Sequence, residues 1–491
     1  MEVLLTAAII FLVCALSSKV LYRYGIPTLL IFLTIGMLLG SDGPGGIYFD
    51  NSELAKSVCN VGLLFIMFSG GFDTNWKTAK PVAFSAGVLA TLGVAITAAV
   101  IGVFAHMVLG FSWLEGMLLG SIISSTDAAS VFSILRSQKL NLKHNLAPLL
   151  EMESGSNDPM AYLLTTIFLG LIVGDGQNIG LLFLGQIIIG TIVGVLVGKG
   201  AAWLINHINL DIEGLYSILV IGLAILSYSS ANLLAGNGFL AVYITGLIMG
   251  NSKLAYKITL VRYFDGLSWL MQILLFLTLG LLVFPSKLAG VALVGMGTAA
   301  FITFIARPLA VFLILTFFKR PVKEQLLVSW VGFRGAASIV FATYPLTAGL
   351  QVADEIFNIV FFVALVSVLV QGTLFIPIAR KLCLVGPEET VLKTFTDYSG
   401  EIQTDLLELN IPEGSPMADK AIMDLDLLPG ILIVMIRRDG KMITPVGTTV
   451  LKVNDTLMLS GENKVLIEAN ARARKRHKNS AVKIRGGQTD N

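Results

Sequence analysis

Residues 151–159 read Glu-Met-Glu-Ser-Gly-Ser-Asn-Asp-Pro and lie near the start of an apolar segment that runs from about 147 to 173. A second polar stretch, Ser-Ser-Thr-Asp-Ala-Ala-Ser at 124–130, interrupts the preceding apolar segment, 113–136. A helix that crosses a bilayer needs about 20 mostly apolar residues, and both segments are long enough. Acids inside such segments are costly and are usually functional. These two stretches therefore indicate a membrane fold and locate its candidate site.

The composition of the whole chain also predicts a membrane protein. Of 491 residues, 55% are hydrophobic and only 13% are charged, whereas soluble domains carry about a quarter charged residues. This excludes a soluble enzyme, a nucleic-acid binder and a secreted disulfide scaffold as descriptions of the whole chain. The three cysteines form neither a disulfide set nor a metal-spaced cluster. We expect no enzymatic activity, no cofactor and no nucleic-acid partner.

Apolar runs outside the two polar stretches predict an all-α polytopic membrane domain over residues 1–382. Thirteen segments are long enough, or nearly so, to span the bilayer. They are 3–18, 27–41, 54–71, 81–109, 113–136, 147–173, 177–206, 212–235, 238–251, 261–283, 287–317, 325–349 and 356–382.

Lys and Arg in the short loops predict the orientation, because cytoplasmic loops carry an excess of both. Sixteen of them lie in or beside the loops that follow odd-numbered segments, and only two follow even-numbered ones. This places the N-terminus outside and the C-terminus in the cytoplasm, in a multi-pass protein of the bacterial inner (plasma) membrane.

The chain changes character after residue 382. About a quarter of the later residues are charged, and we divide them into a linker (383–404), a small α/β cytosolic domain (405–470) and a basic, flexible tail (471–491). Short alternating apolar runs predict strands, and Asp439-Gly440 between two of them predicts a hairpin turn. Residues 418–425 predict a short helix.

Asp158 and Asp127 are the strongest candidates for a cation site. Their segments enter the membrane from opposite sides, and a rise of 1.5 Å per residue puts both acids near the midplane. A break in segment 113–136 would expose carbonyls and half-helix ends to a bound cation. Pro159 weakens the neighbouring helix, and Asn157 leaves Asp158 as the titratable group of that pair. The alternative is a kinked helix with structural hydrogen bonds.

Segment 325–349 contains Trp-Val-Gly-Phe-Arg-Gly-Ala-Ala-Ser at 330–338, in which glycines flank Arg334. Arg334 follows Asp127 by about 207 residues, and segments 1 and 8 begin about 209 residues apart. Segments 1–6 and 8–13 are thus predicted to be inverted repeats with interrupted helices in matching positions, as in secondary transporters. We predict that Arg334 is the counter-ion of Glu153. For Arg307, the other buried arginine, no partner is predicted.

At these residues the sequence resembles the cation/proton antiporter family 1, of the NhaP/NHE type. ESGSNDP, STDAAS and WVGFRGA match the motifs of that family in order, and the resemblance covers the whole membrane domain. It implies a homodimer in which segments 113–136 and 325–349 are crossed, discontinuous helices. One departure is Ala128, where the family usually has proline, but this removes no ligand.

The resemblance also implies roles for individual residues. Asp158 would carry the cation or the proton, with Asp127, Thr126, Ser154 and Asn157 at the monovalent cation site. Glu153 and Arg334 would form a structural ion pair.

The segment after Glu401 resembles the TrkA-C (RCK C-terminal) domain of cation transport proteins, through Leu-Pro-Gly-Ile-Leu-Ile-Val at 428–434 and Val-Asn-Asp at 453–455. The combination is similar to NhaP-type potassium/proton antiporters. It implies a nucleotide or other small regulatory ligand on the cytosolic domain, although a passive dimerisation domain is an equal alternative. Members of that subgroup can carry a further cytosolic domain, so the sequence ending at Asn491 can be part of a longer protein.

These expectations favour electroneutral exchange of one K⁺, or Na⁺, for one H⁺ by alternating access, which would serve pH homeostasis. Asp158 would bind either ion in competition. The first alternative is a ligand-gated cation channel, or a transporter subunit, regulated by the TrkA-C domain, but no TVGYG-like filter is present. A non-transporting sensor is the second alternative, and no catalytic or DNA-binding motif supports it.

Overall fold

The computed structural model describes residues 8–14, 16, 28–137, 140–174, 178–386, 405–412, 415, 417–425, 431–438 and 441–461. The chain divides into two compact units, Met1–Thr396 and Asp397–Asn491. The predicted linker is described only as far as Gly386, and the predicted basic tail lies outside the described residues.

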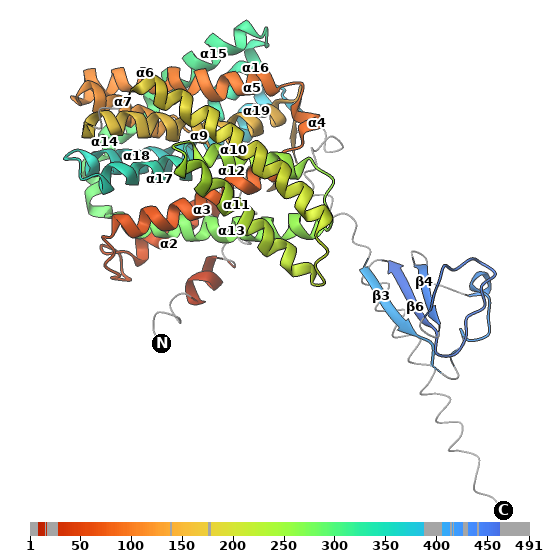
Figure 1. The fold of residues 1–491 in the computed structure, drawn as a ribbon. Coiled ribbons are helices and arrows are strands. Elements are labelled where there is room, and N and C mark those ends of the chain that lie inside the picture. The colour runs from red at the N-terminus through yellow and green to blue at the C-terminus, as the bar shows by residue number, and fades with distance from the viewer. Residues whose placement is uncertain are drawn as a thin grey trace, which may run out of the picture. The chain divides into compact units, whose positions relative to one another are not determined.

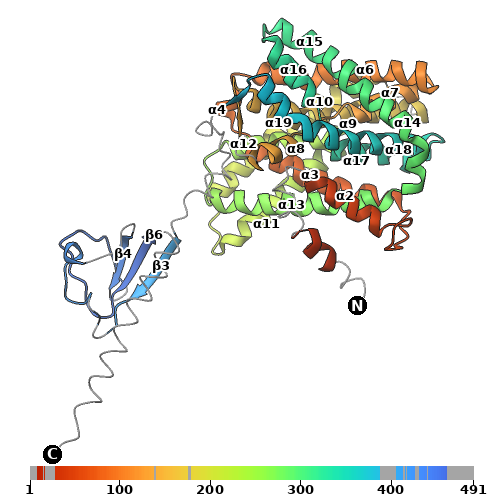
Figure 2. The same cartoon turned by 180° about the vertical axis from the view of Figure 1, so that it is seen from behind.

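The first unit is helical, which confirms the predicted all-α character of the membrane domain (Figures 1 and 2). Its helices and π-helical turns are α2 (Thr28–Leu39), α3 (Ser52–Asp73), α4 (Trp76–Ala79), α5 (Ala83–Val88), η2 (Leu89–Gly93), α6 (Val94–Phe104), η3 (Ala105–Leu109), α7 (Trp113–Ile123), α8 (Ala128–Ser137), α9 (Leu146–Val173), α10 (Ile179–His207), α11 (Glu213–Leu233), α12 (Gly238–Gly250), α13 (Lys257–Leu282), α14 (Pro285–Phe301), η4 (Ile302–Ala306), α15 (Arg307–Phe317), α16 (Val322–Trp330), α17 (Ala336–Thr347), α18 (Ala353–Val366), η5 (Ser367–Gln371) and α19 (Gly372–Lys381).

Within the described residues, eight helices are long and apolar enough to cross a membrane, and four shorter apolar helices accompany them. The total of thirteen spans stays a prediction. Segments 81–109, 287–317 and 356–382 run continuously through π-helical turns, which often lie near functional sites. Segments 113–136 and 325–349 are both interrupted, as predicted, between α7 and α8 and between α16 and α17.

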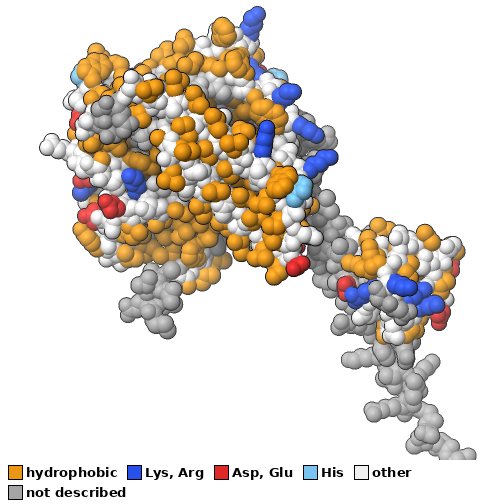
Figure 3. Space-filling model, viewed as in Figure 1, with side chains coloured by type: hydrophobic (Ala, Val, Ile, Leu, Met, Phe, Trp, Pro, Cys, Tyr) orange, Lys and Arg blue, Asp and Glu red, His pale blue; other side chains and the backbone are white. Residues whose placement is uncertain are grey.

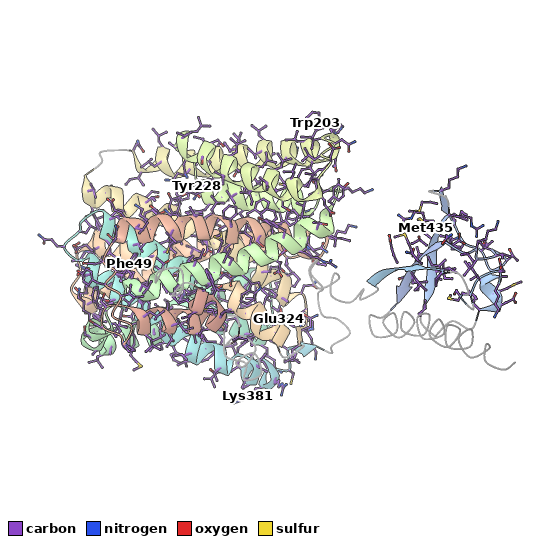
Figure 4. The ribbon with its side chains drawn as sticks, turned by 90° about the horizontal axis from the view of Figure 1, so that it is seen from below. Phe49, Trp203, Tyr228, Glu324, Lys381 and Met435 are labelled. Carbon is purple, nitrogen blue, oxygen red and sulfur yellow. The ribbon has the colours of Figure 1, made fainter. Side chains whose placement is uncertain are left out.

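The helices pack as two groups. One contains α2, α3 and α10–α13, and the other contains α5–α9 and α14–α19, with contacts between the groups mainly through α9 and α17. In Figure 4, Trp203 of α10 and Tyr228 of α11 lie on one side of the unit, whereas Glu324 of α16 and Lys381 of α19 lie on the other. The candidate site residues all belong to the second group.

Side chains on the surface follow the pattern of a membrane protein. Hydrophobic side chains cover the broad face of the helical unit in Figure 3, and Lys and Arg side chains gather along one edge. That edge carries α4 and the adjoining helix ends of Figure 1. The apolar face between polar edges has the character expected where lipid is the solvent.

The second unit contains a four-stranded antiparallel sheet in the order β3-β6-β4-β5. Its strands are β3 (Asp405–Asn410), β4 (Leu432–Arg438), β5 (Lys441–Ile443) and β6 (Thr456–Gly461). Arg438 pairs with Lys441, which confirms the predicted hairpin, although residues 439–440 themselves lie outside the described residues. The predicted helix at 418–425 is wrong: a single 3₁₀ turn, Ile422–Asp424, is formed, because backbone bonds to 447–451 hold this segment.

Candidate functional site

Two helix breaks meet at the centre of the site. α7 ends at Ile123 and α8 begins at Ala128, while α16 ends at Trp330 and α17 begins at Ala336. The backbone N–H of Asp127 donates to the carbonyl of Phe333 over 2.8 Å, so the two broken segments contact each other through their main chains. Four half-helix ends therefore converge where helical hydrogen bonding is interrupted, and their unpaired backbone groups need partners.

Arg334 provides the positive charge at the end of α7. Its Nη1 donates to the carbonyl oxygens of Ile123, over 2.6 Å, and Ser125, over 3.1 Å. The side chain is 1% exposed. A cation at a helix C-terminus is favourable because the unpaired carbonyls carry partial negative charge. Arg334 therefore stabilises the break in the opposite segment.

Asp127 has the complementary position at the start of α8. Its Oδ2 accepts from the Ser130 hydroxyl over 2.6 Å, and its Oδ1 accepts from the Ser130 backbone N–H over 3.4 Å. An acid is favourable at a helix N-terminus for the same electrostatic reason. Gly335 lies directly against this carboxylate, since an added Cβ would lie 2.4 Å from Asp127 Oδ2.

Asp158 lies on α9 beside the same break. The Ser125 hydroxyl donates to Asp158 Oδ1, and the Asp158 side chain is 7% exposed. The adjacent Asn157 donates through Nδ2 to the Thr126 hydroxyl and accepts from the Thr126 N–H over 3.4 Å. The predicted neighbours Asp158, Asn157 and Thr126 are thus brought together, although they come from two different helical segments.

Ser154 completes the cluster one turn earlier on α9. Its hydroxyl donates to the Thr126 carbonyl oxygen over 2.6 Å. Carboxylate, hydroxyl and carbonyl oxygens from 125–127 and 154–158 therefore surround one region, and oxygen ligands suit hard cations. Within the described residues, no group of three or more His, Cys, Asp or Glu side chains could hold a metal ion.

The predicted ion pair between Glu153 and Arg334 is wrong. Glu153 instead pairs with Arg307, whose Nη1 and Nη2 donate to Oε1 and Oε2 over 2.9 and 2.8 Å. Both side chains are almost fully buried, which leaves the two-pronged geometry as the way to satisfy both charges. Gly332 makes room for it, because a Cβ there would lie 2.8 Å from Arg307 Nε.

Three further polar residues were not predicted as part of the site. The Arg334 backbone N–H donates to the Ser367 hydroxyl over 2.9 Å, and that hydroxyl donates to Gln371 Oε1. Gln371 reaches Thr303 with its Nε2 over 3.1 Å. The repeat offset of about 209 residues pairs Ser367 with Asp158, so the inverted repeat was the signal that could have found it.

A small pocket lies beside the two helix breaks, at 124–127 and 331–335, which we call the crossed breaks. Asp127, Ser130 and Arg334 line it together with apolar side chains from α2, α13, α17 and α18. The pocket lies between the two groups of helices, so the polar centre of the second group faces an apolar surface of the first.

The sequence matches known protein families and curated proteins over most of its length. The family described as "Sodium/hydrogen exchanger, transmembrane" matches residues 7–381, and the TrkA-C domain matches residues 406–473. The K(+)/H(+) antiporter NhaP of Alkalimonas amylolytica is 37% identical over 462 residues, covering 93% of this chain and 80% of that protein. The K(+)/H(+) antiporter NhaP2 of Shewanella sp. (strain ANA-3) is 37% identical over 469 residues, covering 94% of this chain and 81% of that protein.

A solved structure also matches. The sodium proton antiporter MjNhaP1 from Methanocaldococcus jannaschii, determined at pH 8, superposes with a TM-score of 0.68 at 26% sequence identity. The match covers 78% of this chain and 99% of that chain. The helical unit, with its two interrupted segments, is therefore similar in arrangement to a known antiporter.

Proposed function

Because the chain belongs to the transmembrane sodium/hydrogen exchanger family, we propose that it exchanges K⁺ for H⁺ across the bacterial inner membrane, one ion for one proton. The preference for K⁺ is supported by the relatives that share both domains, which are named K(+)/H(+) antiporters. Na⁺ is the second candidate, since both ions use the same ligand types.

Asp158 carries the exchanged ion in this proposal. The observation that supports it is that Asp158, within the described residues, has no Lys or Arg within salt-bridge distance. Glu153, by contrast, is neutralised by Arg307. A buried carboxylate without a basic partner is stabilised by binding either a proton or a cation. Competition between the two for one carboxylate makes the exchange obligatory.

The charges around Asp158 support a ratio of one cation to one proton. Glu153 and Arg307 cancel, and Asp127 and Arg334 carry opposite charges at the two crossed breaks. The cluster is therefore neutral when Asp158 holds one monovalent cation or one proton. Since both loaded states have the same charge, the site crosses the membrane without net charge transfer, and exchange is electroneutral.

The cation would be held by oxygens that take part in hydrogen bonds between the broken segment and α9. Asp158 Oδ1 accepts from Ser125, and the Thr126 carbonyl accepts from Ser154. When the Ser125 hydroxyl releases Asp158 and the Ser154 hydroxyl releases the Thr126 carbonyl, the oxygen atoms of Asp158, Ser154 and Thr126 can face the ion. Asp127 adds negative charge, and Asn157 holds Thr126 in place.

Alternating access would proceed by movement of the site-bearing group of helices against the other group. We expect thirteen spans in two inverted six-helix repeats from the apolar segments and their spacing, and a homodimer from the family resemblance. The loop charges place the N-terminus outside and the C-terminus in the cytoplasm. The TrkA-C domain would bind a nucleotide or another small regulatory ligand that adjusts transport.

Proton flux in liposomes tests the proposal. Protein is reconstituted with a trapped pH dye, K⁺, Na⁺, Li⁺ or Rb⁺ gradients are imposed at zero voltage, and Asp158→Asn is compared with the wild type. Asp158→Asn should abolish exchange while preserving expression and dimerisation. Asp354→Asn makes the same chemical change at an exposed acid, 72% accessible, and should transport normally.

Two outcomes would contradict the proposal. Normal exchange by Asp158→Asn would remove Asp158 from the mechanism. A K⁺ current that dissipates membrane potential, with no proton movement against the K⁺ gradient, would identify a channel instead. Imposing a membrane potential should leave the exchange rate unchanged, because an electroneutral cycle moves no net charge.

A further inference from the structure

The chain that leads to the cytosolic unit is attached to the loop between the two site segments. β1 (Asn141–Leu142) lies between α8 and α9, and β2 (Val385–Gly386) follows α19. The two strands pair antiparallel, Asn141 with Gly386 and Leu142 with Val385. A segment at the beginning of the predicted linker therefore contacts the loop that joins Asp127 to Asp158 along the chain.

The attachment continues beyond these two strands. The Lys143 N–H donates to the Leu384 carbonyl over 2.9 Å, and Lys143 Nζ donates to the Cys383 carbonyl over 3.2 Å. Cys383 has a left-handed backbone, with φ 60°. Its N–H bonds to Arg380, and the Leu384 N–H bonds to Ala379. This is the Schellman arrangement that ends a helix and reverses the chain, so the end of α19 directs residues 384–386 onto the loop.

Buried apolar side chains connect this contact to the site helices. Leu142 and Leu384 are each 4% exposed. They belong to one apolar cluster with Val131 and Ile134 of α8 and Leu149 of α9, among others. Because packed interiors transmit displacement between neighbouring side chains, a shift of residues 383–386 displaces the helices that begin beside Asp127 and carry Asp158.

The same loop is also tied to the second broken segment. The His144 carbonyl accepts from Arg320 Nη1 over 3.2 Å, and His144 Nδ1 lies 2.8 Å from Glu324 Oε1 at the start of α16. The Glu324 side chain is 3% exposed. The loop therefore joins α8, α9, α16 and α19 on one side of the crossed breaks.

We propose that residues 383–386 are a latch through which the cytosolic unit regulates transport. When the latch is closed, as in this structure, the loop holds α8 and α9 in the arrangement that brings Ser125 to Asp158. Regulation by the cytosolic unit loosens the latch and lowers the cation affinity of the site. The part of the inference that concerns cation affinity rests on the proposed exchange function.

A disulfide across the latch tests this inference in the full chain. Leu142 and Val385 are direct cross-strand partners next to the pair joined by the Lys143–Leu384 hydrogen bond. They therefore form a non-hydrogen-bonded pair, whose Cα atoms are about 4.5 Å apart, a separation that a disulfide can span. The test protein carries Leu142→Cys and Val385→Cys, with the exposed Cys383 replaced by Ser. A protease recognition sequence is inserted at the unit boundary after Thr396, so that the cytosolic unit can be released before reconstitution.

Release should lower the apparent KM for K⁺ about fivefold in the reduced protein, a size typical of coupling between sites. The oxidised protein should already have the low KM before cleavage, and cleavage should leave its KM unchanged. Leu384→Ala should raise KM, whereas Lys381→Ala, at an exposed position one turn earlier, should not. The inference is overturned if cleavage changes KM equally in the oxidised and the reduced protein, or leaves KM unchanged in both.

Hydrogen exchange separates this inference from the exchange function. The Lys143 amide should exchange about tenfold more slowly after release of the cytosolic unit, because its bond to Leu384 is then no longer loosened by that unit. This readout needs no transport. Slower exchange without K⁺-driven proton flux would support the latch and contradict K⁺/H⁺ exchange. Unchanged exchange of the Lys143 amide would overturn the latch.

Discussion

Arg307 and Glu153 form a two-pronged ion pair, 2.9 and 2.8 Å long, between α15 and α9. The relative exposures of their side chains are 2% and 1%. Arg307 follows η4 directly, and Glu153 lies just over one turn before Asp158. The pair fixes α9 beside the crossed breaks and removes one acid from competition for the transported ion.

Breaking this pair should destabilise the protein strongly. Arg307→Gln leaves Glu153 buried without its partner, and removal of one member of a buried pair costs about 3–5 kcal/mol. Glu153→Gln should have a similar effect. The double variant should lose less stability than the sum of the losses in the two single variants. Thermal unfolding in detergent measures all three. Additive losses would mean that the two side chains do not act as a unit.

Gly335→Ala should reduce transport by about tenfold or more, because small displacements of a reacting group have large effects on rate. A Cβ at this position would lie 2.4 Å from both Cβ and Oδ2 of Asp127, so Asp127 must shift. Gly297→Ala on α14 is the matched control, since nothing lies within 4 Å of its added Cβ. Proton flux in liposomes distinguishes them, and equal rates would contradict the close contact at Gly335.

The cytosolic unit should lose stability in acid because of Asp455. The hydrogen bond from the Arg438 guanidinium, supported by the Lys452 N–H, holds the pKa of the Asp455 carboxyl below its usual value. A carboxyl whose pKa is lower in the folded state than in the unfolded state stabilises the fold. This contribution is fully present above the pKa of the unfolded state, about 3.9. That contribution is lost as the pH falls through the folded value.

Hydrogen exchange of β4 and β6 in the full chain, corrected for intrinsic rates, measures this loss between pH 7 and pH 3. Asp455→Asn should weaken protection at pH 7 and flatten its dependence on pH. Asp419→Asn changes an exposed acid of the same unit and should leave the profile unchanged. A steep acid transition in Asp455→Asn would assign the effect to another group.

The helix breaks could be predicted because their signals are local. Polar and small residues at 124–130 and glycines around Arg334 are poor choices for a continuous apolar helix, and both breaks occur where these signals lie. The prediction of a short helix at 418–425 was wrong for the opposite reason. Long-range backbone hydrogen bonds to 447–451 replace the bonds that a helix would make. Local propensity is a weak guide where such partners exist.

The partner of Glu153 shows the limit of reasoning from residue types. Two buried arginines, Arg307 and Arg334, were available, and spacing along the chain does not tell which one faces α9. The choice depends on the contact between segments 154 residues apart, and on the space left by Gly332. Arg334 instead binds the carbonyls at the end of α7.

The sequence by itself determined the membrane character, the polar stretches that hold Asp127 and Asp158, the interrupted segments and the separate strand-rich unit. Composition and periodicity report these features because each depends on residues close together in the chain. Only the tertiary structure decided that Arg307 neutralises Glu153, that Ser125 binds Asp158 and that residues 383–386 close on the loop before α9. Pairing of buried charges and strands depends on which distant segments pack together, and packing is a property of the whole fold.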